Sequence, residues 1–296
     1  MQNTGTTTWT AAAGYALSSV NPNDNTTWGL NRVQLSPSDS IAPGQSKTFA
    51  FNITVPNSAT YLTGPLHCDW QMINGSTRFG AVSSNPVTVY TFYDVPPTET
   101  YWRYVEAIYT AGLTAGCGAD SQGRALYCPN NTTTRAMAAV YLVRATGKSV
   151  LMSPTPRFAD VGPGLSYYGH VERLGDPSSW YDAGNPCLVP PTAGCAISPP
   201  RYCPNDLVTR AMVAVYLCRA TGKCPWNNPT PTFADVGSGL PYYGFVERLA
   251  DPASWNNDPP TRGCAPSPPR YCPNDTATRA QMAVFLARAF QLPYGQ

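Results

Sequence analysis

The sequence predicts a multidomain chain in which an all-β sandwich precedes a mainly α-helical region built from three repeats. Residues 1–90 are rich in Thr, Ser and Asn, and they alternate apolar with polar residues as half-buried strands do. From residue 91 onwards two sequence blocks recur, and apolar residues follow helical spacing. We expect domain boundaries at 1–90 for the β domain and at 91–149, 150–224 and 225–296 for the repeats.

Composition excludes several classes of function. The chain has 296 residues, which is long enough for two or more domains with separate cores. Only 12% of residues are charged and the formal net charge is +2, so the sequence offers no basic surface for nucleic acid. No apolar run approaches the roughly 20 residues of a membrane helix. The start of the chain lacks signal-peptide features, so we expect either a removed upstream signal or a chain that begins part-way through its gene.

Alternation in the first 90 residues predicts individual strands. Thr48–Val55 has one apolar face, and Leu66, Cys68, Trp70 and Met72 form another. Asn74-Gly75 predicts a tight turn leading into Thr77–Phe79. Because Pro86 cannot donate to a ladder, the last strand is expected to run from Val87 to Tyr90.

Four short motifs in this part resemble the four-tryptophan Ig-like domain, a β-sandwich of extracellular and cargo-binding proteins. They are Asn3-Thr4-Gly5-Thr6-Thr7-Thr8-Trp9, Ile41-Ala42-Pro43-Gly44, Asp69-Trp70-Gln71-Met72 and Phe79-Gly80. The resemblance implies that Trp9, Trp28 and Trp70 are three of the four tryptophans and that the strand before Asn3 is absent. A strand from another chain would complete such a sheet, or else the true strand lies upstream of Met1.

One helical block occurs three times. It reads YCPNDTATRAQMAVFLARAF from Tyr271, YCPNDLVTRAMVAVYLCRA from Tyr202 and YCPNNTTTRAMAAVYLVRA from Tyr127. Thr134, Thr209 and Thr278 stand where a helix N-cap is expected. Only the third copy has Gln281 three residues later, which completes a capping box.

A second block precedes each helical block. Phe158–Trp180 reads FADVGPGLSYYGHVERLGDPSSW, Phe233–Trp255 reads FADVGSGLPYYGFVERLADPASW, and a looser version starts at Thr91. The order Phe-x-Asp-Val, first helix, Gly-Cys loop, Thr-Arg-Ala helix resembles the S-layer homology (SLH) domain, over roughly residues 91–293. The resemblance implies a pseudo-threefold helical bundle that binds pyruvylated cell-wall polysaccharide in grooves between repeats.

The same resemblance implies ligand-binding roles for the motif arginines, which are Arg135, Arg210 and Arg279. The family's Glu after Thr-Arg-Ala is replaced by Met137, Met212 and Gln281, which weakens the comparison if that Glu shapes the sugar pocket. A cation in the first turn of a helix opposes the helix dipole, so each arginine needs a bound carboxylate or an acceptor from a neighbouring repeat. The sequence leaves both alternatives open.

Other recurring polar residues have simpler interpretations. Asp94, Asp160 and Asp235 precede helices and are interpreted as caps, with polar contacts to a ligand as the alternative. Glu172 and Glu247 are interpreted as partners of nearby arginines on a helix surface. Packing is the preferred use of Trp180 and Trp255, although aromatic rings of this kind also stack on sugars.

Ten cysteines favour an oxidising compartment. Three pairs occupy equivalent positions and are predicted to be short-loop disulfides: Cys117 with Cys128, Cys195 with Cys203, and Cys264 with Cys272. Cys218 and Cys224 are both missing from the other repeats, so a bond between them is predicted. Cys68 is interpreted as a buried thiol, and Cys187 is left without a partner.

The sequence therefore predicts a non-enzymatic, extracellular structural protein of the bacterial cell surface. Its expected partners are cell-wall polysaccharide or copies of itself as a homo-oligomer, without nucleic acid, membrane insertion, metal or cofactor. With only His67 and His170, no histidine-based catalytic or metal set can be assembled. The alternatives are a subunit of a self-assembling extracellular filament and a wall-bound enzyme whose catalytic part lies outside this chain.

Overall fold

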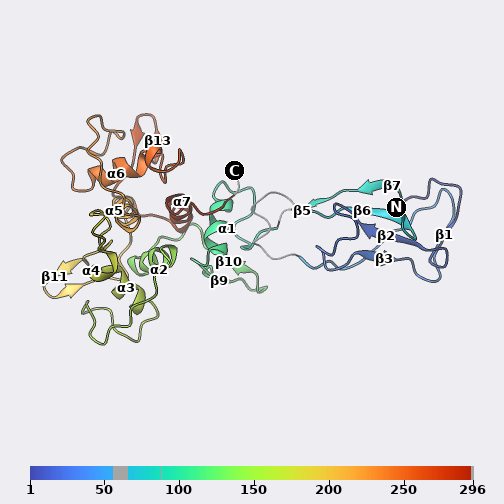
Figure 1. The fold of residues 1–296 in the computed structure, drawn as a ribbon, viewed down its shortest axis with the longest axis horizontal. Helices are drawn as coiled ribbons and strands as arrows, with labels where there is room; N and C mark the ends of the chain where they lie inside the picture. Colours follow the sequence, from blue (N-terminus) through green and yellow to red (C-terminus); the bar gives the residue numbers. More distant parts are fainter. Residues whose placement is uncertain (56–65, 88, 295–296) are drawn as a thin grey trace. The chain divides into compact units, whose positions relative to one another are not determined.

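The computed structural model describes residues 1–55, 66–87 and 89–294, and it divides the chain into two compact units (Figure 1). Met1–Tyr90 forms a unit of strands, and Thr91–Gln296 forms a mainly helical unit. The chain is thus multidomain, and all the helices of its described residues lie in the second unit.

The first unit is organised around a four-stranded antiparallel sheet in the order β3-β2-β6-β7. Its strands are β2 (Tyr15–Ser19), β3 (Arg32–Gln34), β6 (Trp70–Asn74) and β7 (Thr77–Ser83). The predicted turn at Asn74-Gly75 is present: Asn74 pairs with Thr77, and Gly75 has a φ of 61°. Strand β7 is an edge strand, because only β6 pairs with it in the described part of the chain.

Two short strand pairs complete this unit. They join β1 (Trp9–Thr10) to β4 (Ser40–Ile41) and β5 (Leu66–His67) to β8 (Pro86–Val87). Trp9, Trp28 and Trp70 are all buried in one core. Cys68 is a buried thiol in the same core, as predicted, and accepts a hydrogen bond from Trp70 Nε1.

Two strand predictions need correction. Thr48–Val55 forms no ladder, although Phe49 and Phe51 do pack against the core as the alternation predicts. Ile53 and Val55 are exposed, so the apolar face is only half used and tertiary packing stops short of a sheet. The last strand begins at Pro86, not after it, because β8 pairs with the two-residue strand β5 at the sheet margin. Residue 88 lies outside the described residues.

The second unit contains seven α-helices among its described residues. They are α1 (Trp102–Thr110), α2 (Arg135–Ala145), α3 (Tyr168–Gly175), α4 (Pro177–Trp180), α5 (Arg210–Ala220), α6 (Tyr243–Ala250) and α7 (Arg279–Ala289), and the 3₁₀ turn Pro252–Ser254 follows α6. Three two-residue hairpins precede α2, α5 and α7: β9 (Gly118–Ala119) with β10 (Ala125–Leu126), β11 (Ala196–Ile197) with β12 (Pro200–Arg201), and β13 (Ala265–Pro266) with β14 (Pro269–Arg270).

Helices α2, α5 and α7 begin where their sequence predicts. Thr134, Thr209 and Thr278 accept hydrogen bonds from the backbone N–H three residues later. The predicted capping box of Thr278 and Gln281 is present in α7. Each of these helices places its Arg in the first position and ends with a second Arg in its last turn.

The helices pack across the sequence blocks, not within them. Helix α3 packs on α2, α6 packs on α5, and α1 packs on α7, at the far end of the chain (Figure 1). A cyclic set of backbone hydrogen bonds joins the segments that immediately precede α2, α5 and α7. Thr133 N donates to Ala277 O, Ala277 N to Val208 O, and Val208 N to Thr133 O, all at 2.9 Å. The last block therefore closes onto the first.

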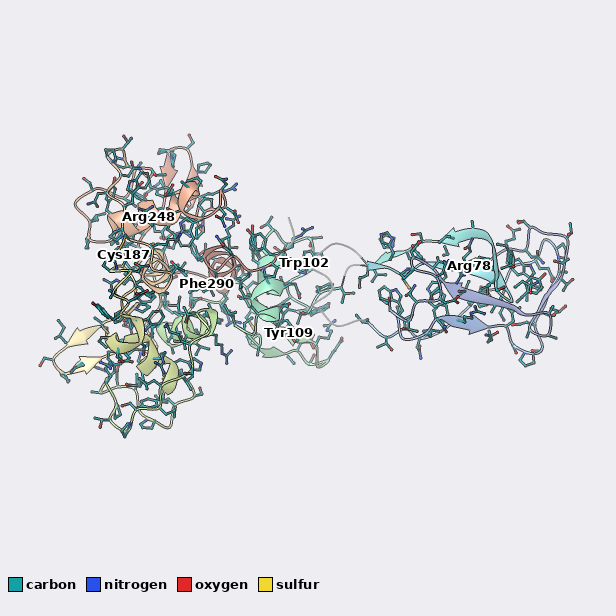
Figure 2. All side chains as sticks on the ribbon, in the orientation of Figure 1. Arg78, Trp102, Tyr109, Cys187, Arg248 and Phe290 are labelled. Atoms are coloured by element: carbon teal, nitrogen blue, oxygen red, sulfur yellow. A yellow bond between two sulfur atoms is a disulfide. The ribbon has the colours of Figure 1, made fainter. Side chains whose placement is uncertain are left out.

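Disulfides join the three predicted short-loop pairs, Cys117–Cys128, Cys195–Cys203 and Cys264–Cys272. The prediction of a Cys218–Cys224 bond is wrong. Cys224 bonds instead to Cys187, labelled in Figure 2, which lies 37 residues earlier. Cys218 lies on the buried face of α5 against the carbonyl of Phe245, so its thiol points into the helix packing and away from the loop that carries Cys224.

Candidate functional site

The three motif arginines lie at the junctions between neighbouring blocks and are buried. Arg135, Arg210 and Arg279 are each 4% exposed. Backbone N–H groups at these positions donate to carbonyls of the next block: Arg135 N to Asp206 O, Arg210 N to Asp275 O, and Arg279 N to Asn131 O. These bonds satisfy donors that every helix N-terminus leaves unpaired.

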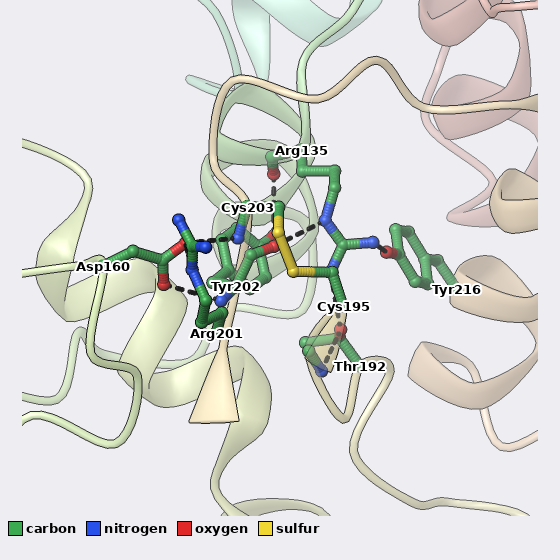
Figure 3. The surroundings of a disulfide bond; sticks show 9 residues. Arg135, Asp160, Thr192, Cys195, Arg201, Tyr202, Cys203 and Tyr216 are labelled. Atoms are coloured by element: carbon green, nitrogen blue, oxygen red, sulfur yellow. Dashed lines mark hydrogen bonds and ion pairs between the residues drawn. A yellow bond between two sulfur atoms is a disulfide. The ribbon is translucent and has the colours of Figure 1, made fainter. Parts of the chain in front are cut away.

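The Arg135 side chain reaches across the junction into the block that follows (Figure 3). Its Nε donates to the carbonyl of Tyr202 at 2.7 Å, one terminal nitrogen donates to the Tyr216 hydroxyl at 2.7 Å, and the other reaches Thr192 Oγ1 at 3.3 Å. In return, the Tyr202 hydroxyl donates to the Arg135 carbonyl. The Tyr202 ring lies under the guanidinium, 4.8 Å from its centroid.

The other two arginines repeat this arrangement with small differences. Arg210 Nε donates to the Tyr271 carbonyl, and Arg279 Nε donates to the Tyr127 carbonyl. Arg279 also donates to the Tyr141 hydroxyl. Beside Arg210 the equivalent residue is Phe285, which has no hydroxyl and contacts the guanidinium only with its ring face. The sequence left open whether a bound carboxylate or an acceptor from a neighbouring repeat serves each arginine. Each arginine has an acceptor from another block. These contacts offset the cost of a first-turn cation.

The aspartates of the Phe-x-Asp-Val motif do not cap helices, so that interpretation is wrong. Asp160 accepts hydrogen bonds from Tyr202 N at 2.7 Å and Cys203 N at 2.8 Å, and Asp94 and Asp235 do the same for their own Tyr-Cys pairs. The cysteine in each pair has a φ of 56°, a left-handed conformation that an ordinary side chain seldom adopts. Burial acts to raise the pKa of Asp160, but the two N–H donors lower it below its usual value.

The glutamates of the first helices are buried, not paired on a helix surface as predicted. Glu172 accepts from Arg157 N, and Glu247 accepts from Thr232 N, Thr232 Oγ1 and Asn228 Nδ2. Glu106, which the sequence analysis did not single out, holds Thr91 in the same way. Burial raises the pKa of Glu106 and Glu172, despite hydrogen bonds that act in the opposite direction. These carboxylates anchor the segment that enters each block.

Aromatic side chains at the ends of the first helices serve packing. Trp180 and Trp255 are 0% and 2% exposed, and each donates its indole N–H to an arginine carbonyl, Arg173 O and Arg248 O respectively. Their faces are therefore closed to a sugar ring.

A cavity of about 320 Å³ opens beside α5, and we call it the α5 groove. Its lining comes from four parts of the chain: Arg135, Pro191–Gly194, Ala211, Met212, Val215, Tyr216, Arg219 and Tyr242. Arg135 and Arg219 are its only charged residues among those the structure describes. The α5 groove thus combines two cations, two tyrosines and apolar side chains, which suits an anionic ligand with an apolar face.

Two further cavities bear on function. The α7 groove, of about 520 Å³, is lined by Thr100, Arg103, Tyr104, Asn256–Asp258, Arg262, Arg288 and Tyr294. The first unit has a cavity of about 890 Å³, whose lining includes Asn3, Trp9, Tyr15, Phe79 and Ala81. It opens between the chain start and edge strand β7.

Residues 91–139 match the family model of the S-layer homology domain. The match covers the first Phe-x-Asp-Val segment, α1 and the Arg135 end of α2. S-layer homology domains are structural modules that anchor proteins at the bacterial cell surface. No curated protein matches the chain.

The residues that the structure describes contain no group of three His, Cys, Asp or Glu side chains able to hold a metal ion. In the part of the chain that the structure describes, no helix has the length and apolarity needed to cross a membrane.

Arg219, the one arginine of the α5 groove outside the Thr-Arg-Ala motif, was not predicted from the sequence. A signal for it was present, because Arg144, Arg219 and Arg288 recur at the end of the same helix. The three residues occupy equivalent positions and cannot be told apart in the sequence. They differ in the partners of their side chains, which come from the loops that face them.

Proposed function

We propose that this chain is a non-enzymatic attachment protein that holds an acidic polysaccharide of the bacterial cell wall through three S-layer homology repeats. The observation that carries the proposal is the α5 groove, in which Arg135 and Arg219 meet without an acidic residue among the lining side chains. A carboxylate bound by arginine gains charge-assisted hydrogen bonds. The S-layer homology match at residues 91–139 supports the same class of function.

Three equivalent junctions support the extension of this assignment beyond residue 139. The Thr-cap, the buried Arg, the Tyr beneath it and the Asp that holds the Tyr-Cys backbone occur at each junction. We therefore propose repeats at 91–149, 150–224 and 225–296. Arg135 is the motif arginine best placed for a ligand, since it also lines the α5 groove, whereas Arg210 and Arg279 serve the junctions.

The test is co-sedimentation of the full chain with purified bacterial cell walls whose polysaccharide carries pyruvate ketals. We expect the protein to pellet with intact walls and to stay in solution after mild acid has removed the ketals. Equal sedimentation with both preparations, or with neither, would reject an acidic wall polymer as the ligand.

A second candidate function is a filament subunit, and the cavity of the first unit favours it. In the part of the chain that the structure describes, the second edge of strand β7 has no partner strand; Val82 on it is 43% exposed, next to a cavity lined by Trp9, Tyr15 and Phe79. We propose that a strand from another copy adds to this edge and places an apolar side chain among the three rings, in a four-tryptophan Ig-like sandwich. A repeated contact of this kind propagates as a filament if its rotation does not close.

Substitution of exposed Ala81, which lines that cavity, tests the second candidate. Light scattering and electron microscopy of the concentrated wild-type protein should show homo-oligomers or filaments. Ala81→Arg should stay monomeric because it fills the space beside β7, whereas Thr155→Arg, an exposed change in the second unit, should assemble like the wild type. A wild-type protein that stays monomeric at all concentrations rules out strand addition between copies.

A further inference from the structure

Three equivalent arginines lie in the last turns of α2, α5 and α7, and the fold gives them different partners. Arg144, Arg219 and Arg288 each face the helix that packs on their own helix, where the residue opposite is His170, Phe245 or Tyr104. A last-turn cation is favoured by the helix dipole, so position alone explains all three. Their hydrogen-bond and ion-pair partners distinguish them.

Arg288 is neutralised by the chain itself. Its Nε lies 3.2 Å from Asp258 Oδ1, and a terminal nitrogen donates to the Tyr104 hydroxyl at 2.7 Å. The Tyr294 hydroxyl donates to the other oxygen of Asp258, so this carboxylate is held on two sides. The position beside Arg288 is therefore already filled by an internal carboxylate, in a groove that Arg103 and Arg262 also line.

Arg144 is tied to the backbone. One of its terminal nitrogens donates to the carbonyl of Leu113 at 3.2 Å and approaches that of Gly112 at 3.5 Å. These carbonyls belong to the loop that precedes the first disulfide, and they occupy the guanidinium without a charged partner.

The guanidinium of Arg219, alone among the three, has no hydrogen bond or ion pair to any residue that the structure describes. Its guanidinium lies over the Phe245 ring, 5.6 Å from the centroid, and it is half-buried in the α5 groove. Burial lowers the pKa of Arg219, as expected when a cation is desolvated without a counter-charge. Buried Arg135 adds a second positive charge to the lining of the same groove.

The loops that face these arginines explain the difference. Before Cys264 the chain reads Asp258-Pro-Pro-Thr-Arg-Gly, and before Cys195 it reads Val189-Pro-Pro-Thr-Ala-Gly. Counted back from the cysteine, Val189 therefore occupies the position of Asp258. Where the third block provides a carboxylate for its arginine, the second block provides an apolar side chain.

We infer that the α5 groove binds one carboxylate of an acidic sugar beside Arg219, and that Asp258 occupies the equivalent position beside Arg288. One chain then binds one ligand anion, although it carries three similar junctions. This inference rests on the proposed function, because it assigns the wall polymer to one groove and gives the chemistry that recognises it.

Reciprocal substitutions at Val189 test the inference. The probe is a pyruvate-ketal glycan fragment released from purified walls, titrated calorimetrically into the full chain. Arg219→Gln and Val189→Asp should each weaken binding by about ten-fold or more, because the first removes the cation and the second neutralises it. Val189→Asn, which has the size of Asp without its charge, and Arg144→Gln should bind like the wild type. Wild-type affinity in both Arg219→Gln and Val189→Asp would overturn the inference.

The stoichiometry provides a second, independent measurement. The wild type should bind one fragment per chain, and Asp258→Asn should bind two, because the amide leaves Arg288 without its internal carboxylate. Two or three fragments on the wild type, or one on a folded Asp258→Asn protein, would contradict the role given to Asp258. Thermal unfolding establishes that each variant is folded.

The two levels of the proposal fail in different ways. A wild-type protein that ignores both intact walls and the fragment removes the proposed function together with the inference. A wild-type protein that binds walls through some other groove leaves the function in place, and then Arg219→Gln pellets with walls as well as the wild type does.

Discussion

Arg279 Nε donates to the carbonyl oxygen of Tyr127 at 2.8 Å, across 152 residues of sequence. The Tyr127 hydroxyl donates back to the carbonyl of Arg279 at 2.8 Å, so the two residues are bound reciprocally. This pair joins the last block to the first, and with its two counterparts it makes the helical unit a closed ring of three junctions.

Replacement of Arg279 by Ala should destabilise the helical unit strongly. The change leaves the Tyr127 carbonyl and the Tyr141 hydroxyl without this donor, and each buried group left unpaired costs about 1–3 kcal/mol. Denaturant unfolding measures the loss. Arg262→Ala, with 72% of its side chain exposed, is the control and should change stability by less than about 0.5 kcal/mol. Similar unfolding midpoints for both variants would show that the junction contributes little.

The buried glutamates predict a loss of stability as the pH rises from 4.5. Burial raises the pKa of Glu106 and Glu172 in the folded chain above the ordinary value of 4.5. A raised folded pKa means that the proton is held more tightly when folded, so the stabilisation is complete below pH 4.5 and is lost as the pH passes the folded pKa. Glu106→Gln/Glu172→Gln should flatten this slope, since Gln still accepts a hydrogen bond. Urea unfolding between pH 4.5 and 7 measures it, and parallel curves for variant and wild type would contradict the prediction.

Asp235 should control the local stability of the third Tyr-Cys pair. Asp235→Asn leaves one carbonyl oxygen to serve the N–H groups of Tyr271 and Cys272, which both donate to the carboxylate. We expect a loss of about 1–3 kcal/mol and faster hydrogen exchange at these two amides. Exposed Asp206→Asn is the matched control. Unchanged exchange at both amides would show that the disulfide alone fixes this turn.

Two cysteine thiols should become reactive only when the protein is unfolded in the absence of a reductant. Cys68 and Cys218 are buried, and burial raises the pKa of Cys218 to about 12, so neither should react with iodoacetamide in the folded protein. Peptide mapping without reduction should recover Cys187 linked to Cys224. A peptide linking Cys218 to Cys224 would show that the Cys187 pairing is wrong.

Local signals in the sequence were sufficient for the helices and the short-loop disulfides. A Thr cap and a Gln three residues later act within one turn, so Thr278 and Gln281 specify the start of α7 without tertiary information. The repeated cysteine pairs lie only 8 or 11 residues apart and are similarly local.

Non-local partners were beyond the sequence analysis. The bond of Cys187 depends on where an insertion folds back, with Asn185 Nδ2 donating to the Gly222 carbonyl beside Cys224. The aspartates were interpreted as helix caps because the next helix is near in sequence, whereas the backbone they hold lies 33 to 43 residues further on. Burial of Glu172 and Glu247 required knowing which segment covers each helix.

The packing of α1 on α7 has a consequence for biosynthesis. As the ribosome releases the chain from its amino end, α3 and α6 each follow their partner, α2 or α5, within a few tens of residues. Helix α1 is made well before its partner α7, so its apolar face, which includes Val105 and Ile108, stays uncovered until residues 279–289 have been synthesised. Translation that stops before residue 279 would therefore release a chain with an open end, which a chaperone or a protease would recognise as unfinished.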